Sequence, residues 1–240
     1  MCTVLLCTCA VEDKLGNVRF HSEPYPAKLS EWNLFSFKDR LDFATGVVPY
    51  DLNMPLFSDY AQKLRTIYIP PGQSAKFDAE GPFEFPVGTI VSKTFFYFTD
   101  KDLVLLDAEW DGNPLNLAAN DIRLIETRLL VRQEHGWDTL PYIWRGDDAS
   151  LTISGDLLAL KTNNATEVTA KIADSSNRGK ESGTEELHYL IPSKNQCASC
   201  HATNHSTGLN QPIGLKARYL NRAGPSNNEN QLVSMKKKVV

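Results

Sequence analysis

The chain has 240 residues, of which 42% are hydrophobic and 22% charged, and its formal net charge at pH 7 is -4. This length suits one or two domains with a buried core. The mild negative charge argues against a nucleic-acid-binding protein, which normally carries a basic face, and no apolar run approaches the roughly 20 residues of a membrane-spanning helix.

The N-terminal residues 1–16 differ in composition from the rest of the chain. Residues 4–10 are apolar, acidic residues follow, and three of the five cysteines fall here (Cys2, Cys7 and Cys9). The stretch around Cys9 faintly resembles a lipoprotein cleavage box, although no basic residues precede it. We predict that residues 1–16 are a remnant of an export signal or a lipoprotein segment. A plain N-terminus with incidental cysteines is the alternative.

The middle of the chain carries β-strand patterns. Residues 29–35 predict a short helix or turn and residues 50–60 a loop. Short runs rich in β-branched and aromatic residues then alternate with Pro and Gly turns, at residues 65–69, 90–98, 124–132, 142–144 and 150–153. We predict a mainly β domain over residues 17–190, an antiparallel sandwich or partial barrel, with a long hairpin or surface loop over the polar residues 163–184. Residues 191–240 form a C-terminal segment of loops and short helices, with one or two helical turns over residues 216–221.

The last two cysteines belong to the motif Cys197-Ala198-Ser199-Cys200-His201. This is C-x-x-C-H, the signature of c-type haem attachment. Two thiols bond to the two vinyl groups of haem, and the imidazole next to the second thiol binds the iron from the proximal side. A composition of five Cys and five His gives only about 0.002 such matches by chance.

Other C-x-x-C chemistries fit less well. A zinc site needs four ligands, and no second pair of this kind lies outside residues 1–16. A thioredoxin-type motif would follow a strand in a βαβ unit, which the sequence does not predict. We therefore predict one haem c, bound covalently by Cys197 and Cys200 and ligated through its iron by His201. Residues 191–240 then form the haem-attachment segment.

Haem attachment also predicts the location and function. Covalent haem ligation takes place outside the bacterial cytoplasm, so we expect a periplasmic or outer-envelope protein, at most lipid-anchored and without a nucleic-acid partner. Electron transfer is the first hypothesis, and no catalytic residue is predicted. A haem enzyme with an open distal site, such as a peroxidase or small-nitrogen-compound oxidase, is the second. An envelope binding module with a structural haem is the third.

The sixth iron ligand has four candidates. Met235 follows the motif, as the distal methionine does in small cytochromes c, but it precedes three lysines near the end of the chain. Such a tail lacks the dry wall that a thioether ligand needs, and we predict that Met235 is not the ligand. If the motif helix continues, His205 shares a face with His201. His188 is expected on a strand, and Met54 in a loop.

Further polar and aromatic residues have default structural roles. The predicted strand near residue 130 carries three charged residues expected to form a solvated face: Glu126, Arg128 and Arg132. Two lysines near the motif are expected at the surface, with pairing to haem propionates as the alternative: Lys194 and Lys216. Three aromatic residues are expected in the core or beside the haem: Trp137, Tyr142 and Trp144.

With these motifs in hand, the chain resembles an uncharacterised family of bacterial c-type cytochromes that often carry two haems. The matching segments occur in family order: LSEWNLF, VVPYDLNMPLFSDYAQKLRTIYIPPG, FPVGTIVSKTFFY, LIETRLLVR, GWDTLPYIW, IPSKNQCASCH, PIGLKARYLNR and NENQL. The resemblance implies an exported haem protein with redox partner proteins in the envelope and no defined enzyme activity. A parallel β-helix protein is a further partner that it implies.

Two departures from the family qualify the resemblance. Met54 stands where the family has a small polar residue, and the chain ends without a second C-x-x-C-H. It therefore resembles the first-haem portion, as a fragment or a monohaem variant. The FPVGTIVSK segment with a later C-x-x-C-H is also similar to β-rich hydroxylamine-oxidising proteins whose haem is crosslinked to a lysine. Lys93 would be the nearest lysine, and a structural strand lysine is the expected role.

Overall fold

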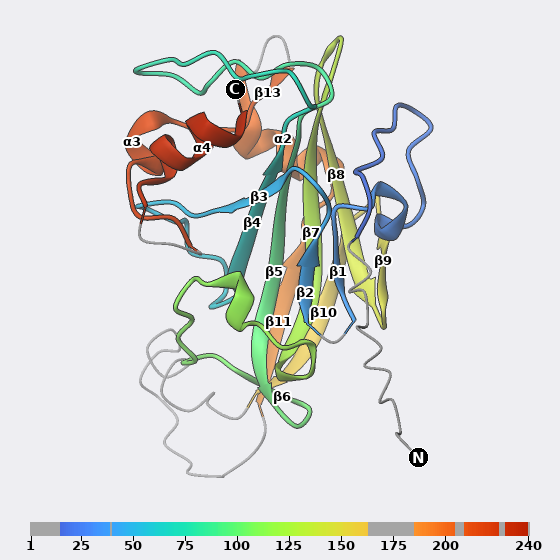
Figure 1. Cartoon of the computed structure of the whole chain (residues 1–240). Coiled ribbons are helices and arrows are strands. Elements are labelled where there is room, and N and C mark those ends of the chain that lie inside the picture. Colours follow the sequence, from blue (N-terminus) through green and yellow to red (C-terminus); the bar gives the residue numbers. More distant parts are fainter. Residues whose placement is uncertain (1–14, 39, 163–184, 205–208, 226–228, 240) are drawn as a thin grey trace, which may run out of the picture.

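The computed structural model describes residues 15–38, 40–162, 185–204, 209–225 and 229–239. Residues 1–14 and 163–184, with most of the predicted export segment and all of the predicted surface loop, lie outside this range. Across the described residues the chain is mainly β, as predicted, with a few short helices (Figure 1). No helix among the described residues is long and apolar enough to cross a membrane.

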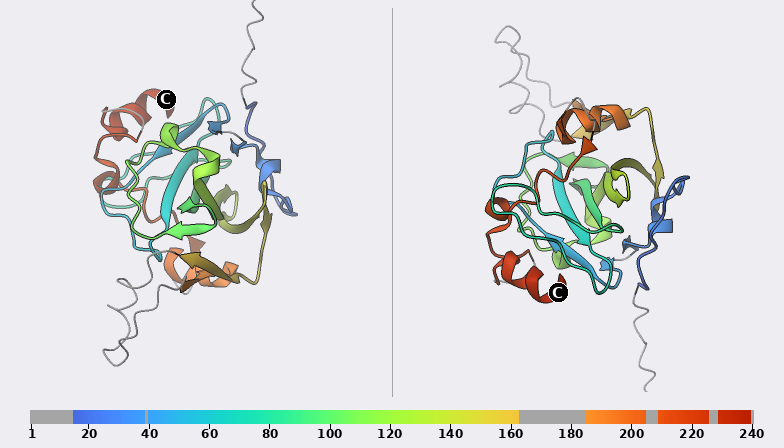
Figure 2. Two further views of the ribbon diagram at one scale, coloured as in Figure 1. Left: turned by 90° about the horizontal axis from the view of Figure 1, so that it is seen from below. Right: turned by 90° about the horizontal axis from the view of Figure 1, so that it is seen from above.

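One nine-stranded sheet dominates the fold. Its strands are β3 (Val47–Tyr50), β4 (Gln62–Tyr68), β5 (Ile90–Asp100), β6 (Leu103–Leu105), β7 (Ile122–Gln133), β8 (Gly136–Arg145), β9 (Asp148–Leu151), β10 (Asp156–Thr162) and β11 (Glu185–Ile191). The main path runs β11-β10-β6-β5-β7-β8-β9, and β4 joins β5 and carries β3. Every pair is antiparallel except β10 with β6. Figure 2, which looks along the strands, shows the sheet curled into a half-barrel. The partial barrel is therefore the correct one of the two predicted architectures.

The remaining elements are short. They are η1 (Leu29–Trp32), β1 (Phe35–Phe37), β2 (Leu41–Phe43), η2 (Pro114–Asn116), η3 (Ala119–Asp121), α2 (Lys194–His201), β12 (Ala202–Asn204), β13 (Leu209–Asn210), α3 (Ala217–Leu220) and α4 (Gln231–Val239). The turn predicted over residues 29–35 is η1, and the helical turn predicted over residues 216–221 is α3. Helix α4 was not predicted.

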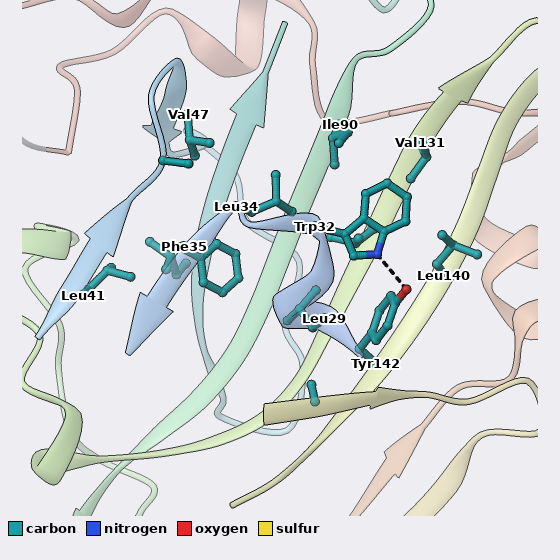
Figure 3. Packing of buried hydrophobic residues seen from close by; sticks show 14 of the residues in the cluster. Leu29, Trp32, Leu34, Phe35, Leu41, Val47, Ile90, Val131, Leu140 and Tyr142 are labelled. Atoms are coloured by element: carbon teal, nitrogen blue, oxygen red, sulfur yellow. Dashed lines mark hydrogen bonds between the residues drawn. The ribbon is translucent and has the colours of Figure 1, made fainter. Parts of the chain in front are cut away.

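The N-terminal segment covers one face of the sheet. Trp32 is fully buried there, and its indole Nε1 donates a hydrogen bond of 2.8 Å to the hydroxyl of Tyr142 (Figure 3). That hydroxyl donates in turn to the carbonyl of Pro26, at 2.9 Å. Burial raises the pKa of Tyr142 to about 12. Tyr142 is thus a core residue, as expected, and its hydroxyl is satisfied on both sides.

The opposite face of the sheet carries two apolar clusters. One contains Leu130 and is covered by the C-terminal segment, including Leu220 of α3 and Met235 of α4. The other contains Phe95 and is covered by β10 and β11, with Tyr189 fully buried. Because side chains alternate between the faces of a strand, the strand positions between the two clusters must also face this side. Those positions are charged, and the predicted haem motif lies beside them.

Candidate haem-attachment site

The haem motif forms the C-terminal part of the eight-residue helix α2, which packs against β8 and the ribbon of β12 and β13. A capping box starts this helix. The Ser193 hydroxyl accepts from the Gln196 amide at 3.3 Å, and the Gln196 side chain accepts from the Ser193 amide at 2.8 Å. The pattern Ser-x-x-Gln is a sequence signal for a helix start. It would have located this helix, which the composition of the segment alone did not.

The three motif residues lie on one side of α2. Positions i, i+3 and i+4 share a helix face, and Cys197, Cys200 and His201 have this spacing. The Cys197 side chain is buried, that of Cys200 is exposed, and both thiols are free. One helix face therefore presents two thiols and an imidazole together, with one thiol towards the sheet and the other towards solvent.

A pair of hydrogen bonds fixes His201 to Gln211. The imidazole Nδ1 lies 2.9 Å from the backbone carbonyl oxygen of Gln211, and the Gln211 amide donates to the His201 carbonyl at 2.8 Å. Because a carbonyl oxygen only accepts, Nδ1 must carry the proton, and the lone pair on Nε2 is left available. Metal-binding histidines have this arrangement, in which the second nitrogen donates to a carbonyl or carboxylate.

Gln211 is held in place by the neighbouring ribbon. Ala202 pairs with Asn210 across β12 and β13, and the Asn210 side chain donates to the Thr139 hydroxyl of β8 at 3.2 Å. The carbonyl that orients His201 is therefore tied to the sheet. Nothing in the sequence pattern marks Gln211, because its backbone and not its side chain performs this role.

The electrostatics favour a neutral imidazole. Burial is the main cause that lowers the pKa of His201, and Lys93 and Arg128 lower it further, whereas the bond to Gln211 opposes the shift. A lowered pKa keeps His201 unprotonated near neutral pH, which is the form that binds a metal. These properties of His201, together with the two thiols on its helix face, fit a covalently bound haem.

The redox alternative for the C-x-x-C pair fits poorly. A reactive thiol needs an accessible position and a lowered pKa. Cys197 is only 5% exposed, and burial raises its pKa despite the nearby Arg128. In the described parts of the chain, no group of three or more His, Cys, Asp or Glu side chains is arranged to hold a metal ion.

Three of the four candidate sixth ligands can be placed. His188 lies on β11 with its side chain 63% exposed, and the next residue, Tyr189, points into the core. Met54 is 74% exposed. Met235 packs partly buried against the apolar cluster of Leu130. Met235 is therefore less exposed than the tail position predicted for it, while the prediction that it is not the iron ligand stays untested. His205 lies outside the described residues.

The prediction of a solvated face on β7 was wrong. Glu126 has no exposed surface. Arg128 forms an ion pair with it and donates from Nε to Glu126 Oε2 at 2.8 Å, and the Tyr189 hydroxyl donates to Oε1 at 2.7 Å. The charged side chains of β7 lie on its inner side, because α2 and β11 cover the face that the sequence alternation of this strand assigned to solvent. Arg132 is partly buried and donates to the Gln133 carbonyl at 2.7 Å.

The remaining residues named from the sequence have structural surroundings. Trp137 contacts Phe85 edge to face, and the indole of Trp144 donates to the Thr127 hydroxyl at 2.9 Å. Both belong to the packing of the sheet, as expected. Lys194, at the start of α2, and Lys216, which precedes α3, are both partly buried.

No known family model matches this chain, and no curated protein or solved structure shows significant similarity to it.

Proposed function

We propose that the protein is an exported c-type cytochrome that carries one haem, attached through Cys197 and Cys200 and ligated by His201. The observation that carries this proposal is the hydrogen bond from His201 Nδ1 to the Gln211 carbonyl, which leaves Nε2 as the free nitrogen on the face shared with both thiols. When bound, haem supplies an iron that alternates between Fe(II) and Fe(III).

The chain's own residues provide attachment, orientation and shielding. Cys197 would hold the group from the buried side of α2, and Gln211 fixes the plane of the His201 ring. Cys200 is exposed, so it would hold one edge of the group near the surface. A near-surface edge suits electron exchange with a partner protein, and we propose redox proteins of the bacterial envelope, including a parallel β-helix protein, as partners. The same proposal places the chain in the periplasm or outer envelope, as the first-haem portion of the cytochrome family that it resembles.

A haem enzyme with an open distal site is the second candidate. It is favoured by the positions of two potential sixth ligands, since His188 and Met54 both face solvent. Six-coordinate, low-spin iron would support electron transfer, whereas five-coordinate, high-spin iron would support substrate binding at the iron.

The test is expression with export and a haem-maturation system. We expect haem to stay on the chain through denaturing electrophoresis. Cys197→Ser should leave at most one thioether bond, and His201→Ala should remove the proximal ligand and change the optical spectrum. Ser199→Ala is the matched control, because it alters an exposed position inside the motif and no predicted ligand. Loss of all haem from the unaltered chain would contradict the proposal.

The optical spectrum of the same preparation separates the two candidate functions. Low-spin bands in both oxidation states support the electron carrier, and a near-infrared sulfur-to-iron band would identify a methionine ligand. High-spin bands support the enzyme.

A further inference from the structure

Four cations lie together on one face of the sheet. They occupy neighbouring positions on three adjacent strands, and we call them the cationic row: Lys63, Arg65, Lys93 and Arg128. Lys93 pairs directly with Arg65 on β4 and with Arg128 on β7. Lys63 is two residues from Arg65 on β4, so it lies on the same face. The ring of Phe95 sits within the row, 5.0 Å from Lys93 Nζ and 4.5 Å from the Arg128 guanidinium carbon.

Only half of the row has carboxylate partners among the described residues. Arg65 contacts Asp51 at 2.8 Å, and Arg128 is paired with Glu126. Neither Lys63 nor Lys93 has a carboxylate oxygen within ion-pairing distance in the described part of the chain. Lys63 Nζ donates to the Ala61 carbonyl at 3.2 Å.

Two partly buried ammonium groups that no carboxylate contacts are costly, although Asp51 and Asp59 act on Lys63 from a distance and Glu126 acts on Lys93. Burial, followed by the neighbouring arginines, lowers the pKa of Lys93 to about 8, and burial likewise lowers that of Lys63 to about 8. A buried cation normally has a carboxylate partner or is replaced by an apolar residue. The pKa of both lysines stays lowered despite these carboxylates, so the two ammonium groups are incompletely compensated on this face.

Two members of the row lie within electrostatic range of the haem motif, and Lys63 acts in turn on Lys93. Lys93 and Arg128 both act on the Cys197 thiol and on the His201 imidazole. The group proposed for α2 carries two propionate carboxylates, and Lys63 and Lys93 are the two members of the row that no carboxylate contacts among the described residues. Lysine and arginine are the side chains that hold carboxylates in proteins.

We propose that Lys63 and Lys93 bind the two propionate groups of the haem attached to α2. This inference rests on the proposed function. It replaces Lys194 and Lys216, the lysines near the motif in sequence, as the propionate partners, and it gives Lys93 a role other than that of a plain strand residue. The carboxylates would complete the charge balance of the row.

The experiment is resonance Raman spectroscopy of the exported, haem-loaded protein. Lys63→Met and Lys93→Met should each shift the propionate bending band and lower the midpoint potential, because a positive charge near the iron favours the reduced state. Lys63→Arg and Lys93→Arg should keep the band closer to its original position. Methionine removes a buried charge and fills similar space, so these variants are expected to fold. The arginine variants keep the charge and test the proposal if the methionine variants do not fold.

Lys194→Met is the matched control, since it removes a lysine from α2 itself but outside the row, and its propionate band should not move. The proposal is overturned if both methionine variants keep their haem with unchanged propionate bands. It is also overturned if Lys93→Met changes only the spin-state bands, which would place the lysine nitrogen at the iron. Failure of the proposed function is a different result, because the unaltered protein would then carry no covalent haem.

Discussion

Glu126 is a carboxylate without exposed surface that is held by one cation and one hydroxyl. Removing its charge would leave Arg128, a partly buried cation, beside an amide. Breaking a buried ion pair from one side costs about 3 kcal/mol, because the remaining charge is left without a partner. We therefore expect Glu126→Gln to lower the free energy of unfolding of the haem-loaded protein by about this amount, measured by urea denaturation.

The matched control is Glu84→Gln. Glu84 pairs with Lys76 at 3.1 Å, and both side chains are largely exposed. An exposed ion pair contributes little, so the change should stay within about 0.5 kcal/mol. Equal losses in the two variants would show that Glu126 has no special role in this face.

Some residue roles could be predicted from the sequence and others could not. The C-x-x-C-H motif marks Cys197, Cys200 and His201 as the residues of the proposed haem site, because the spacing itself is the chemical requirement. Gln211 could not be predicted, because it acts through its backbone carbonyl. Glu126 was assigned to solvent because the alternation of one strand does not reveal that β11 and α2 return to cover its polar side.

At the scale of elements, the capping box of α2 is the local feature that positions the haem motif. Replacing an N-cap serine with alanine costs about 1 kcal/mol. We expect Ser193→Ala to destabilise the first turn of α2, because the Gln196 amide loses its acceptor. Hydrogen exchange at the amides of Gln196 and Cys197 should become faster.

Ser199→Ala provides the comparison within the same helix. Ser199 is exposed and lies past the first turn, and alanine is the better helix former, so protection should be unchanged or slightly higher. If exchange is equally fast in both variants, the capping box does not stabilise α2.

The mainly β fold was predictable because short strand patterns separated by turns recur over about 100 residues, and such a series is typical of an all-β sandwich or barrel. The curvature of the sheet and the order of its strands were not predictable. They depend on contacts distant in sequence, such as the pairing of β10 with both β11 and β6. The C-terminal helix α4 was missed because three lysines in a row suggested a solvated tail, although Leu232 and Met235 pack against the sheet.

At the scale of the whole molecule, the two unpaired lysines predict how stability depends on pH in the haem-free chain. Both have a pKa of about 8 in the folded state, against about 10.4 in an unfolded chain. Between these values the unfolded state binds more protons, so the free energy of unfolding rises with pH. Below pH 8 the lysines are charged in both states, and the cost of burying the charge is fully present.

The titration of buried tyrosines limits the pH range over which the free energy of unfolding rises. Burial raises the pKa of Tyr97 and Tyr189, so above about pH 10 the unfolded state loses their protons first and stability falls. The haem-free chain should therefore be more resistant to urea at about pH 9.5 than at pH 7, as followed by far-UV circular dichroism. The double variant Lys63→Met, Lys93→Met should lose most of this difference.

In the haem-loaded protein the propionates would restore an ordinary lysine pKa, and the rise in stability between pH 8 and 10 should shrink. Equal stability of the haem-free chain at the two pH values would contradict this prediction, because it would mean that the two ammonium groups already have compensating negative charge.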